Sequence, residues 1–263
     1  MLFSDVIGQA NVKRQLKQML DENRVPHAML FAGNEGCGKL PMALALAQRL
    51  LCQHPTAEGE PCGQCQACHM AAKLAHPDLH FIFPTIKPTG KAGIVVSDQY
   101  LPEWRKQIAE TPYFSRQTWL KRMGVEKQQS LINVAEADNI IGKLANVSSQ
   151  GGYRVVVMWL AEQMNAECAN KLLKVLEEPP SQTVFILTAD HPELLLTTIL
   201  SRTQRIDFAP LSADDIANAL QQHNGLQPDD ARMVARAANG SFVNALDQVT
   251  MNADKAQFFD LFV

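Results

Sequence analysis

A short apolar run that leads into a glycine-rich loop and then into a helix constrains this fold most strongly. Residues Ala28–Ala32 are apolar without a helical period, and the glycine loop Gly33–Gly38 follows directly. Beyond the loop, apolar residues recur at helical spacing as far as Leu50. A strand, a glycine loop and a helix in this order predict an α/β unit built on a parallel sheet.

Apolar segments and helical patterns alternate along the next part of the chain. Further strands are predicted over Leu79–Phe83, Leu131–Val134, Arg154–Leu160, Thr183–Leu187 and Arg205–Phe208. Helical patterns between them predict helices over Glu136–Leu144, 165–176 and Glu193–Leu200. This alternation predicts a three-layer α/β/α module over residues 1–208, with residues 84–130 as an irregular insertion that carries short helices.

The strand pattern stops after Pro210, and only helical patterns follow. They predict helices over 212–223, Asp229–Ala238 and Phe242–Val249. Residues 209–263 therefore predict a small helical domain behind the α/β module. The chain ends in an apolar stretch typical of a helix that has just begun, so we expect it to be a piece of a longer protein.

Composition excludes several classes of protein. Hydrophobic residues make up 46% and charged residues 19%, which is typical of a globular chain rather than a disordered one. A formal net charge of −3 excludes a uniformly basic nucleic-acid coat. No apolar run approaches the roughly 20 residues of a membrane helix, and no signal peptide is visible. We therefore expect a cytoplasmic protein that does not associate with membranes.

The glycine loop matches all but the last position of the phosphate-loop pattern G-x-x-x-x-G-K-[ST]. Gly33, Gly36 and Gly38 would let backbone N–H groups converge on phosphate oxygens, and Lys39 would reach the β- and γ-phosphates. Leu40 stands where a hydroxyl should bind Mg²⁺. The alternative is a glycine-rich turn between strand and helix that binds no nucleotide.

The acidic residues that ATP hydrolysis requires are also missing. A carboxylate should follow a later buried strand to bind Mg²⁺, with a second one beside it to polarise water. Trp159 and Leu160 occupy those positions after the apolar run from Arg154, and Glu162 lies too far along to replace them. The sequence therefore predicts that ATP is not hydrolysed and that ATP or ADP binds weakly or not at all.

Four cysteines crowd into seventeen residues and have the spacing of a metal site. Cys52, Cys62, Cys65 and Cys68 offer four thiolates, enough for a closed tetrahedral Zn²⁺ site with a structural role. An open position for a catalytic water would not remain. The zinc module would span about residues 52–78. The alternatives are an iron–sulfur cluster and a redox disulfide pair.

Four segments together resemble the AAA+ clamp-loader subunits of bacterial DNA polymerase III. They are 3–9, the glycine loop 33–40, 168–180 and 198–204, and their order and spacing match over nearly the whole chain. The stretch Leu172–Pro180 is the most specific of them. The degenerate ATP site is similar to the delta-prime group and not to the ATPase gamma/tau group. The resemblance implies an AAA+ module with a zinc-module insertion, then a helical lid, and a C-terminal collar domain that is absent from this chain.

The resemblance also implies a role for Arg202. It lies in Ser201-Arg202-Thr203, where the family carries a Ser-Arg-Cys motif whose arginine acts on the ATP of a neighbouring subunit. The changed third position departs from that motif. The alternative is an arginine at a helix C-terminus that only satisfies carbonyl groups. Ala189 and Val243 stand where ATPase members carry polar or arginine nucleotide sensors.

The resemblance implies a clamp-loader subunit that is itself catalytically inactive. It would sit beside gamma/tau ATPase subunits and the delta subunit, and the assembled complex would place the ring-shaped sliding clamp on primed DNA. The alternative is an active AAA+ ATPase, similar to gamma/tau, that acts on DNA or protein.

Overall fold

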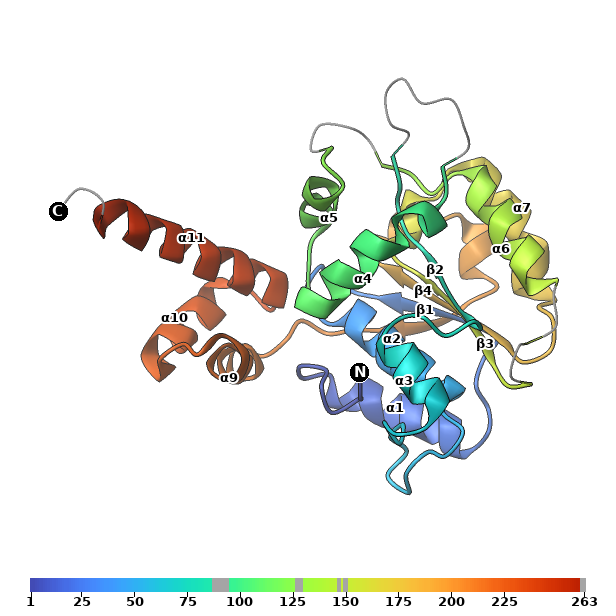
Figure 1. Cartoon of the computed structure of the whole chain (residues 1–263), viewed down its shortest axis with the longest axis horizontal. Coiled ribbons are helices and arrows are strands. Elements are labelled where there is room, and N and C mark those ends of the chain that lie inside the picture. Colours follow the sequence, from blue (N-terminus) through green and yellow to red (C-terminus); the bar gives the residue numbers. More distant parts are fainter. Residues whose placement is uncertain (87–94, 126–129, 146–147, 149–150, 261–263) are drawn as a thin grey trace.

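The core of the structure is a parallel sheet of five strands in the order β2-β3-β4-β1-β5 (Figure 1). The computed structural model describes residues 1–86, 95–125, 130–145, 148 and 151–260. The strands are β1 (Ala28–Ala32), β2 (Leu79–Ile82), β3 (Arg154–Met158), β4 (Thr183–Ala189) and β5 (Gln204–Asp207).

Helices cover both faces of this sheet, so the predicted three-layer α/β/α module is confirmed (Figure 1). One face carries α1 (Ala10–Asp21), α2 (Lys39–Leu51), α3 (Gln66–Ala72), α4 (Leu101–Glu110) and α5 (Arg116–Arg122). The other carries α6 (Val134–Leu144), α7 (Ala166–Glu177) and α8 (Thr197–Leu200).

The three central strands, β1, β3 and β4, contribute alternate side chains to the two layers of core. In β3, Val155 and Val157 pack into the cluster with α2, whereas Val156 packs into the cluster with α6 and α7. All three are 0% exposed. Because both faces are covered, the strand reads as a continuous apolar run instead of alternating with polar residues.

Three predicted elements differ in the structure. The strand predicted over Leu131–Val134 is wrong: the segment makes only isolated bridges, and Asn133 caps α6 by accepting a hydrogen bond from an N–H two residues on. The predicted strand Arg154–Leu160 ends at Met158, because Leu160 adopts a left-handed φ of 56°. The helix predicted over Glu193–Leu200 is a 3₁₀ turn and then α8, separated by extended residues.

The segment 84–130 contains the short helices that the sequence predicts, α4 and α5. Besides α4 and α5 it contains a 3₁₀ turn, Ser97–Tyr100, while residues 87–94 and 126–129 lie outside the described ranges. Trp104 and Trp119 are both 0% exposed, and Trp104 stacks on Phe83 with ring centroids 4.3 Å apart. The described part of this segment is therefore part of the core layer, because Trp104 and Trp119 bury large apolar surfaces there.

The last three helices form a separate apolar cluster beside the sheet (Figure 1). They are α9 (Ala213–Asn224), α10 (Pro228–Ala237) and α11 (Phe242–Asp260). Ser212 caps α9 by accepting a hydrogen bond from the Asp215 N–H. The third helix is longer than predicted. Within the described ranges, no helix combines the length and the apolar character needed to cross a membrane.

A buried carboxylate joins α6 to the end of β2. Glu136 is 1% exposed, and its Oε1 accepts hydrogen bonds from the N–H and the hydroxyl of Ser97, at 2.5 and 2.7 Å. The Ser97 hydroxyl also contacts the backbone of Phe83. Burial raises the pKa of Glu136 to about 7. The fold therefore favours the protonated carboxyl.

This raised pKa predicts a pH-dependent stability. The contribution of protonated Glu136 to the free energy of unfolding is fully present below pH 4.5, the ordinary pKa of a glutamate, and is lost as the pH rises through about 7, its pKa in the folded chain. Between pH 5 and 8 the free energy of unfolding should fall by up to about 3 kcal/mol from this group. Glu136→Gln keeps an acceptor oxygen and cannot ionise, so its urea unfolding should lack that fall. Glu167→Gln, at an exposed site on α7, should keep the wild-type profile. Identical profiles for the Glu136→Gln variant and the wild type would contradict the assignment.

Candidate functional site

The glycine loop links the carboxyl end of β1 to the start of α2 and is held against α11. Gly36 and Gly38 have φ angles of 78° and 99°, in the left-handed region that favours glycine. A Cβ on Gly36 would lie 2.2 Å from Ser241 Oγ. The carbonyl of Gly36 also accepts a hydrogen bond from the Phe242 N–H at 3.0 Å. The loop is therefore fixed to the first turn of α11.

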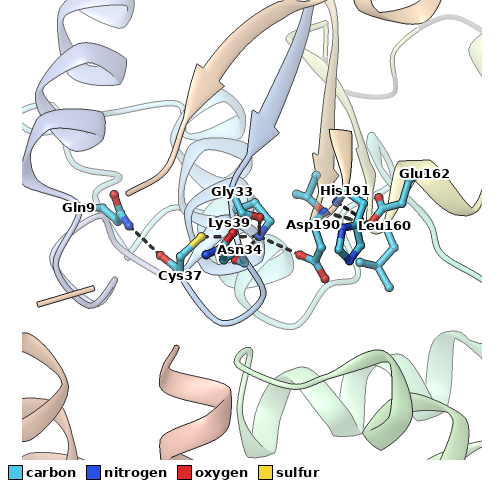
Figure 2. Close-up of polar contacts among 10 residues, drawn as sticks. Gln9, Gly33, Asn34, Cys37, Lys39, Leu160, Glu162, Asp190 and His191 are labelled. Atoms are coloured by element: carbon cyan, nitrogen blue, oxygen red, sulfur yellow. Dashed lines mark hydrogen bonds and ion pairs between the residues drawn. The ribbon is translucent and has the colours of Figure 1, made fainter. Parts of the chain in front are cut away.

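Lys39 points back into this loop instead of toward solvent (Figure 2). Its Nζ donates to the carbonyls of Gly33 and Asn34, each at 2.6 Å, and lies 2.8 Å from Asp190 Oδ1. The side chain is 5% exposed. An ammonium group has three N–H donors. All three are used inside the chain, where a phosphate-binding lysine would direct them to a ligand.

Asp190 follows β4 directly, and sequence reasoning gave it no role. Glu162 Oε1 accepts hydrogen bonds from the backbone N–H groups of Asp190 and His191, at 2.9 and 3.3 Å (Figure 2). Burial raises the pKa of Glu162. Glu162 therefore fixes the end of β4. The signal that could have found Asp190 was its place just after a buried parallel strand, on the same sheet edge as Lys39.

Little space remains where a nucleotide would sit. The cavity over the loop has a volume of about 30 Å³. It is lined by Lys39 and Leu40, by Tyr113 and Phe114, and by Trp159, Asp190 and Val243 among others. Ligand pockets are commonly about 300–1,000 Å³. A space of this volume is the size of a water molecule, and a larger cavity of about 520 Å³ lies beside it, lined in part by Tyr113, Phe114 and Val243.

The two positions that should carry acids hold core residues. Trp159 is 6% exposed and packs between Phe114 and Trp104, at ring-centroid distances of 4.8 and 5.4 Å. Leu160 is 3% exposed, and its N–H donates to Thr188 Oγ1 at 3.3 Å. Neither side chain has an oxygen with which to bind a metal or a water. Both residues therefore belong to the apolar core on the α2 side of the sheet.

The two sensor positions are also apolar and buried. Ala189 is the last residue of β4 and is 0% exposed. Val243, in the first turn of α11, is 4% exposed and lines the small cavity. Neither offers a polar group to a phosphate, in agreement with the sequence at these positions.

The four cysteines come together in the structure. Their Sγ atoms all lie within 4.8 Å of one another, and those of Cys62 and Cys68 are 3.9 Å apart. Four sulfurs bound tetrahedrally at about 2.3 Å would be separated by about 3.8 Å. The group therefore fits one metal ion. A cluster would place several irons and sulfides between the thiolates and would space them more widely.

Backbone N–H groups already point at these sulfurs. The N–H groups of Cys62, Cys65 and Cys68 donate to the Sγ atoms of Cys52, Cys62 and Cys65, at 3.2, 3.3 and 3.4 Å. The N–H groups of Gln64 and Cys65 lower the pKa of Cys62 to about 6. These donors favour the thiolate at Cys62, the form that binds metal, whereas burial raises the pKa of the Cys52 and Cys68 thiols.

Arg202 lies between α8 and β5 and contacts α7. Its Nε and Nη2 donate to Glu177 Oε2 at 3.0 and 2.8 Å, and its Nη1 donates to the Thr198 carbonyl at 3.1 Å. The side chain remains 29% exposed. Ser201 and Thr203 use their hydroxyls on carbonyls of α8. The carbonyl contact considered as the alternative is present, but it takes only one of five guanidinium N–H groups.

Arg202 and the glycine loop lie at opposite edges of the sheet. β5 runs parallel to β1 with Met29 opposite Gln204, so Arg202 lies level with the start of β1, while the loop follows its end. Five residues at about 3.3 Å each separate the two edges by about 17 Å. Arg202 therefore lies too far from Lys39 to act in this chain's own loop.

The importance of Lys39 for folding can be tested. Lys39→Ala would leave the Asp190 carboxylate, which is 18% exposed, without its partner. We expect a loss of about 2–3 kcal/mol in the free energy of unfolding, somewhat below the value for fully buried pairs. Urea unfolding measures it. Lys39→Ala combined with Asp190→Ala should cost less than the sum of the two single changes. A loss below about 0.5 kcal/mol for Lys39→Ala would show that the ion pair is not structural.

Comparison with known proteins gives a consistent result. Residues 8–212 match the family model described as DNA polymerase III, delta subunit. The DNA polymerase III subunit delta' of Bacillus subtilis (strain 168) is 30% identical over 231 residues, which cover 88% of this chain and 56% of that protein. The subunit gamma/tau of Mycobacterium bovis is 30% identical over 260 residues, covering 95% and 37%. The chain thus spans about half the length, or less, of these curated relatives.

A solved structure supports the fold. The RuvB Holliday junction branch migration motor of Thermotoga maritima has a TM-score of 0.56 and 13% identity, and the match covers 97% of this chain and 64% of that one. At this identity the likeness bears on the fold alone. It is consistent with the AAA+ type of α/β module.

Proposed function

The chain belongs to the clamp-loader delta' family of DNA polymerase III, and we propose that it is a subunit that acts on a neighbour's ATP without hydrolysing its own. The observation that carries this proposal is the contrast between the two edges of the sheet. At one edge Lys39 is neutralised inside the chain. At the other, Arg202 keeps an accessible guanidinium.

Arg202 would supply charge to the neighbouring site. Phosphoryl transfer builds negative charge on the oxygens of the transferred group, and an arginine provided by an adjacent subunit stabilises that charge. The neighbour would be a gamma/tau ATPase subunit. With the delta subunit, the assembly would use ATP turnover to place the sliding clamp on primed DNA.

The chain's own loop would take no part in turnover. Leu40 lacks the hydroxyl for Mg²⁺, and Trp159 and Leu160 lack the carboxylates. The small cavity and the ion pair of Lys39 support the same conclusion from geometry. The loop would then serve as a structural joint between the α/β module and α11.

An active ATPase similar to gamma/tau is the second candidate. It is favoured by the preserved Lys39 and by the gamma/tau relative that covers 95% of this chain. It would require Lys39 to leave Asp190 and the aromatic side chains over the loop to move apart. It would still lack ligands for Mg²⁺ at the usual positions.

The four cysteines would hold one structural Zn²⁺. The ion would tie the end of α2 to the start of α3, because Cys52 follows α2 and Cys65 caps α3. The loop between them is joined to the N-terminal segment through Glu60, which accepts from the Phe3 N–H and pairs with Lys17, both at 2.8 Å. The site would therefore brace the module and would not perform chemistry.

Arg202→Ala tests the trans role in the assembled clamp loader. Hydrolysis at the one ATP site facing Arg202 should fall by a factor of about 10³ or more. DNA-stimulated ATPase of the whole complex should fall less, because other sites still turn over, and clamp loading should fall with it. Arg205→Ala is the matched control, since Arg205 is exposed nearby and pairs with Asp207. Equal activity of the Arg202→Ala and Arg205→Ala complexes would reject the trans role.

Isolated-chain turnover separates the two candidate functions. The purified chain should release no phosphate from ATP above background. Leu40→Thr should not restore activity, because the hydroxyl alone does not replace the missing carboxylates. Magnesium-dependent turnover by the wild-type chain would favour the active-ATPase alternative.

Metal content tests the cysteine site. Protein purified without chelators should contain about one zinc per chain. Cys65→Ser should lose the metal and lower the thermal stability, whereas Cys168→Ser, at a buried cysteine on α7, should keep the metal. Iron in place of zinc, or metal-free protein with paired cysteines, would support one of the alternatives.

A further inference from the structure

We propose that Glu177 is a positioning residue for Arg202, one that holds the guanidinium ready to meet a phosphate of the neighbouring subunit. This inference rests on the proposed trans role of Arg202. It adds a residue whose part is to orient the guanidinium and not to contact the ATP.

The contacts of Arg202 leave a defined pair of donors. Nε and Nη2 both donate to one oxygen, Glu177 Oε2, and Nη1 donates to the Thr198 carbonyl. These contacts use three of the five N–H groups of a guanidinium. One N–H on Nη1 and one on Nη2 have no partner within the described ranges of the chain. Two such donors in a planar group suit a bidentate contact with phosphate oxygens.

The two elements that hold Arg202 are fixed by the core. Glu177 ends α7, and Thr198 lies in α8. Next to them, Leu176 and Ile199 are each 0% exposed and belong to the same apolar cluster. The acceptor oxygens therefore sit on rigid supports, which is the condition for orienting a side chain closely.

Stability alone does not account for Glu177. A carboxylate in the last turn of a helix meets the negative end of the helix dipole, which is unfavourable. The ion pair with Arg202 is solvent-accessible, with the two side chains 58% and 29% exposed. Such pairs contribute little to folding. What the contact does change is the freedom of a long side chain, because an arginine ordered in advance loses less entropy when it meets its ligand.

Two opposite roles for Glu177 can be distinguished by substitution. If Glu177 positions Arg202, it needs only one acceptor oxygen in the right place, because Nε and Nη2 of Arg202 both donate to Oε2. Glu177→Gln keeps such an oxygen, so the kcat of ATP hydrolysis by the assembled complex should stay within about twofold. Glu177→Ala removes it, and kcat should fall about three- to tenfold with the KM for ATP unchanged. If Glu177 instead held Arg202 away from the ATP and had to release it, both Glu177 variants would show a higher kcat than the wild type.

The experiment compares seven clamp-loader complexes that differ only in this chain: wild type, Glu177→Ala, Glu177→Gln, Arg202→Ala, Arg202→Lys, the double variant Glu177→Ala with Arg202→Ala, and Glu178→Ala. Glu178→Ala is the matched control, because Glu178 is the next residue, is exposed and has no ion pair with Arg202 among the described residues. It should keep the wild-type kcat. Thermal unfolding of the chain should be the same for the Glu177 and Glu178 variants, which separates positioning from folding.

The outcomes are distinct. A loss in Arg202→Ala with no loss in Glu177→Ala overturns the positioning role and leaves the trans role intact. No loss in Arg202→Ala overturns both. Arg202→Lys keeps the positive charge but cannot make the forked contact, so it should lose about as much kcat as Arg202→Ala. Adding Glu177→Ala to Arg202→Ala should cause no further loss, and an additive loss would overturn the proposal.

Discussion

The ion pair between Lys39 and Asp190 organises the edge of the sheet on which the rest of the site depends. It joins the first residue of α2 to the end of β4 across 2.8 Å, in a setting where the lysine side chain is 5% exposed. A buried ammonium requires a compensating charge. Asp190 provides that charge inside the chain. The glycine loop that precedes Lys39 contacts the first turn of α11 through Gly36, whose carbonyl accepts a hydrogen bond from the Phe242 N–H.

A parallel sheet separates two tasks by its geometry. Every strand ends at the same edge, so the glycine loop, Asp190 and the aromatic side chains gather there and close the site. The segments that enter the strands gather at the other edge, where Arg202 lies before β5. An arginine in that place cannot serve its own loop. Under the proposed function, its ligand would be held by another subunit.

The sequence predicted most of the sheet but not all that surrounds it. Strands with continuous apolar runs, such as β3 and β4, were found because they are buried on both faces. The prediction of a strand over Leu131–Val134 was wrong, because a short apolar run does not reveal whether a partner strand lies beside it. Residues 84–130 were predicted to carry short helices, and α4 and α5 confirm this. The partners of Trp104 and Trp119 could not be predicted, because Phe83, which both rings contact, is distant from them in the sequence.

For this protein, the sequence by itself determined which chemical groups are available. It carries four cysteines at metal-site spacing, a loop in which Lys39 is followed by Leu40 instead of a Ser or Thr, and Trp159 and Leu160 in place of acidic residues. These are matters of residue type and local spacing, which the chain carries before it folds. Only the tertiary structure decided which side chains these groups contact. That Lys39 meets Asp190, and that Arg202 meets Glu177, depends on the strand order and on helix packing. Those contacts join residues 151 and 25 positions apart, and local pattern carries no information at such separations.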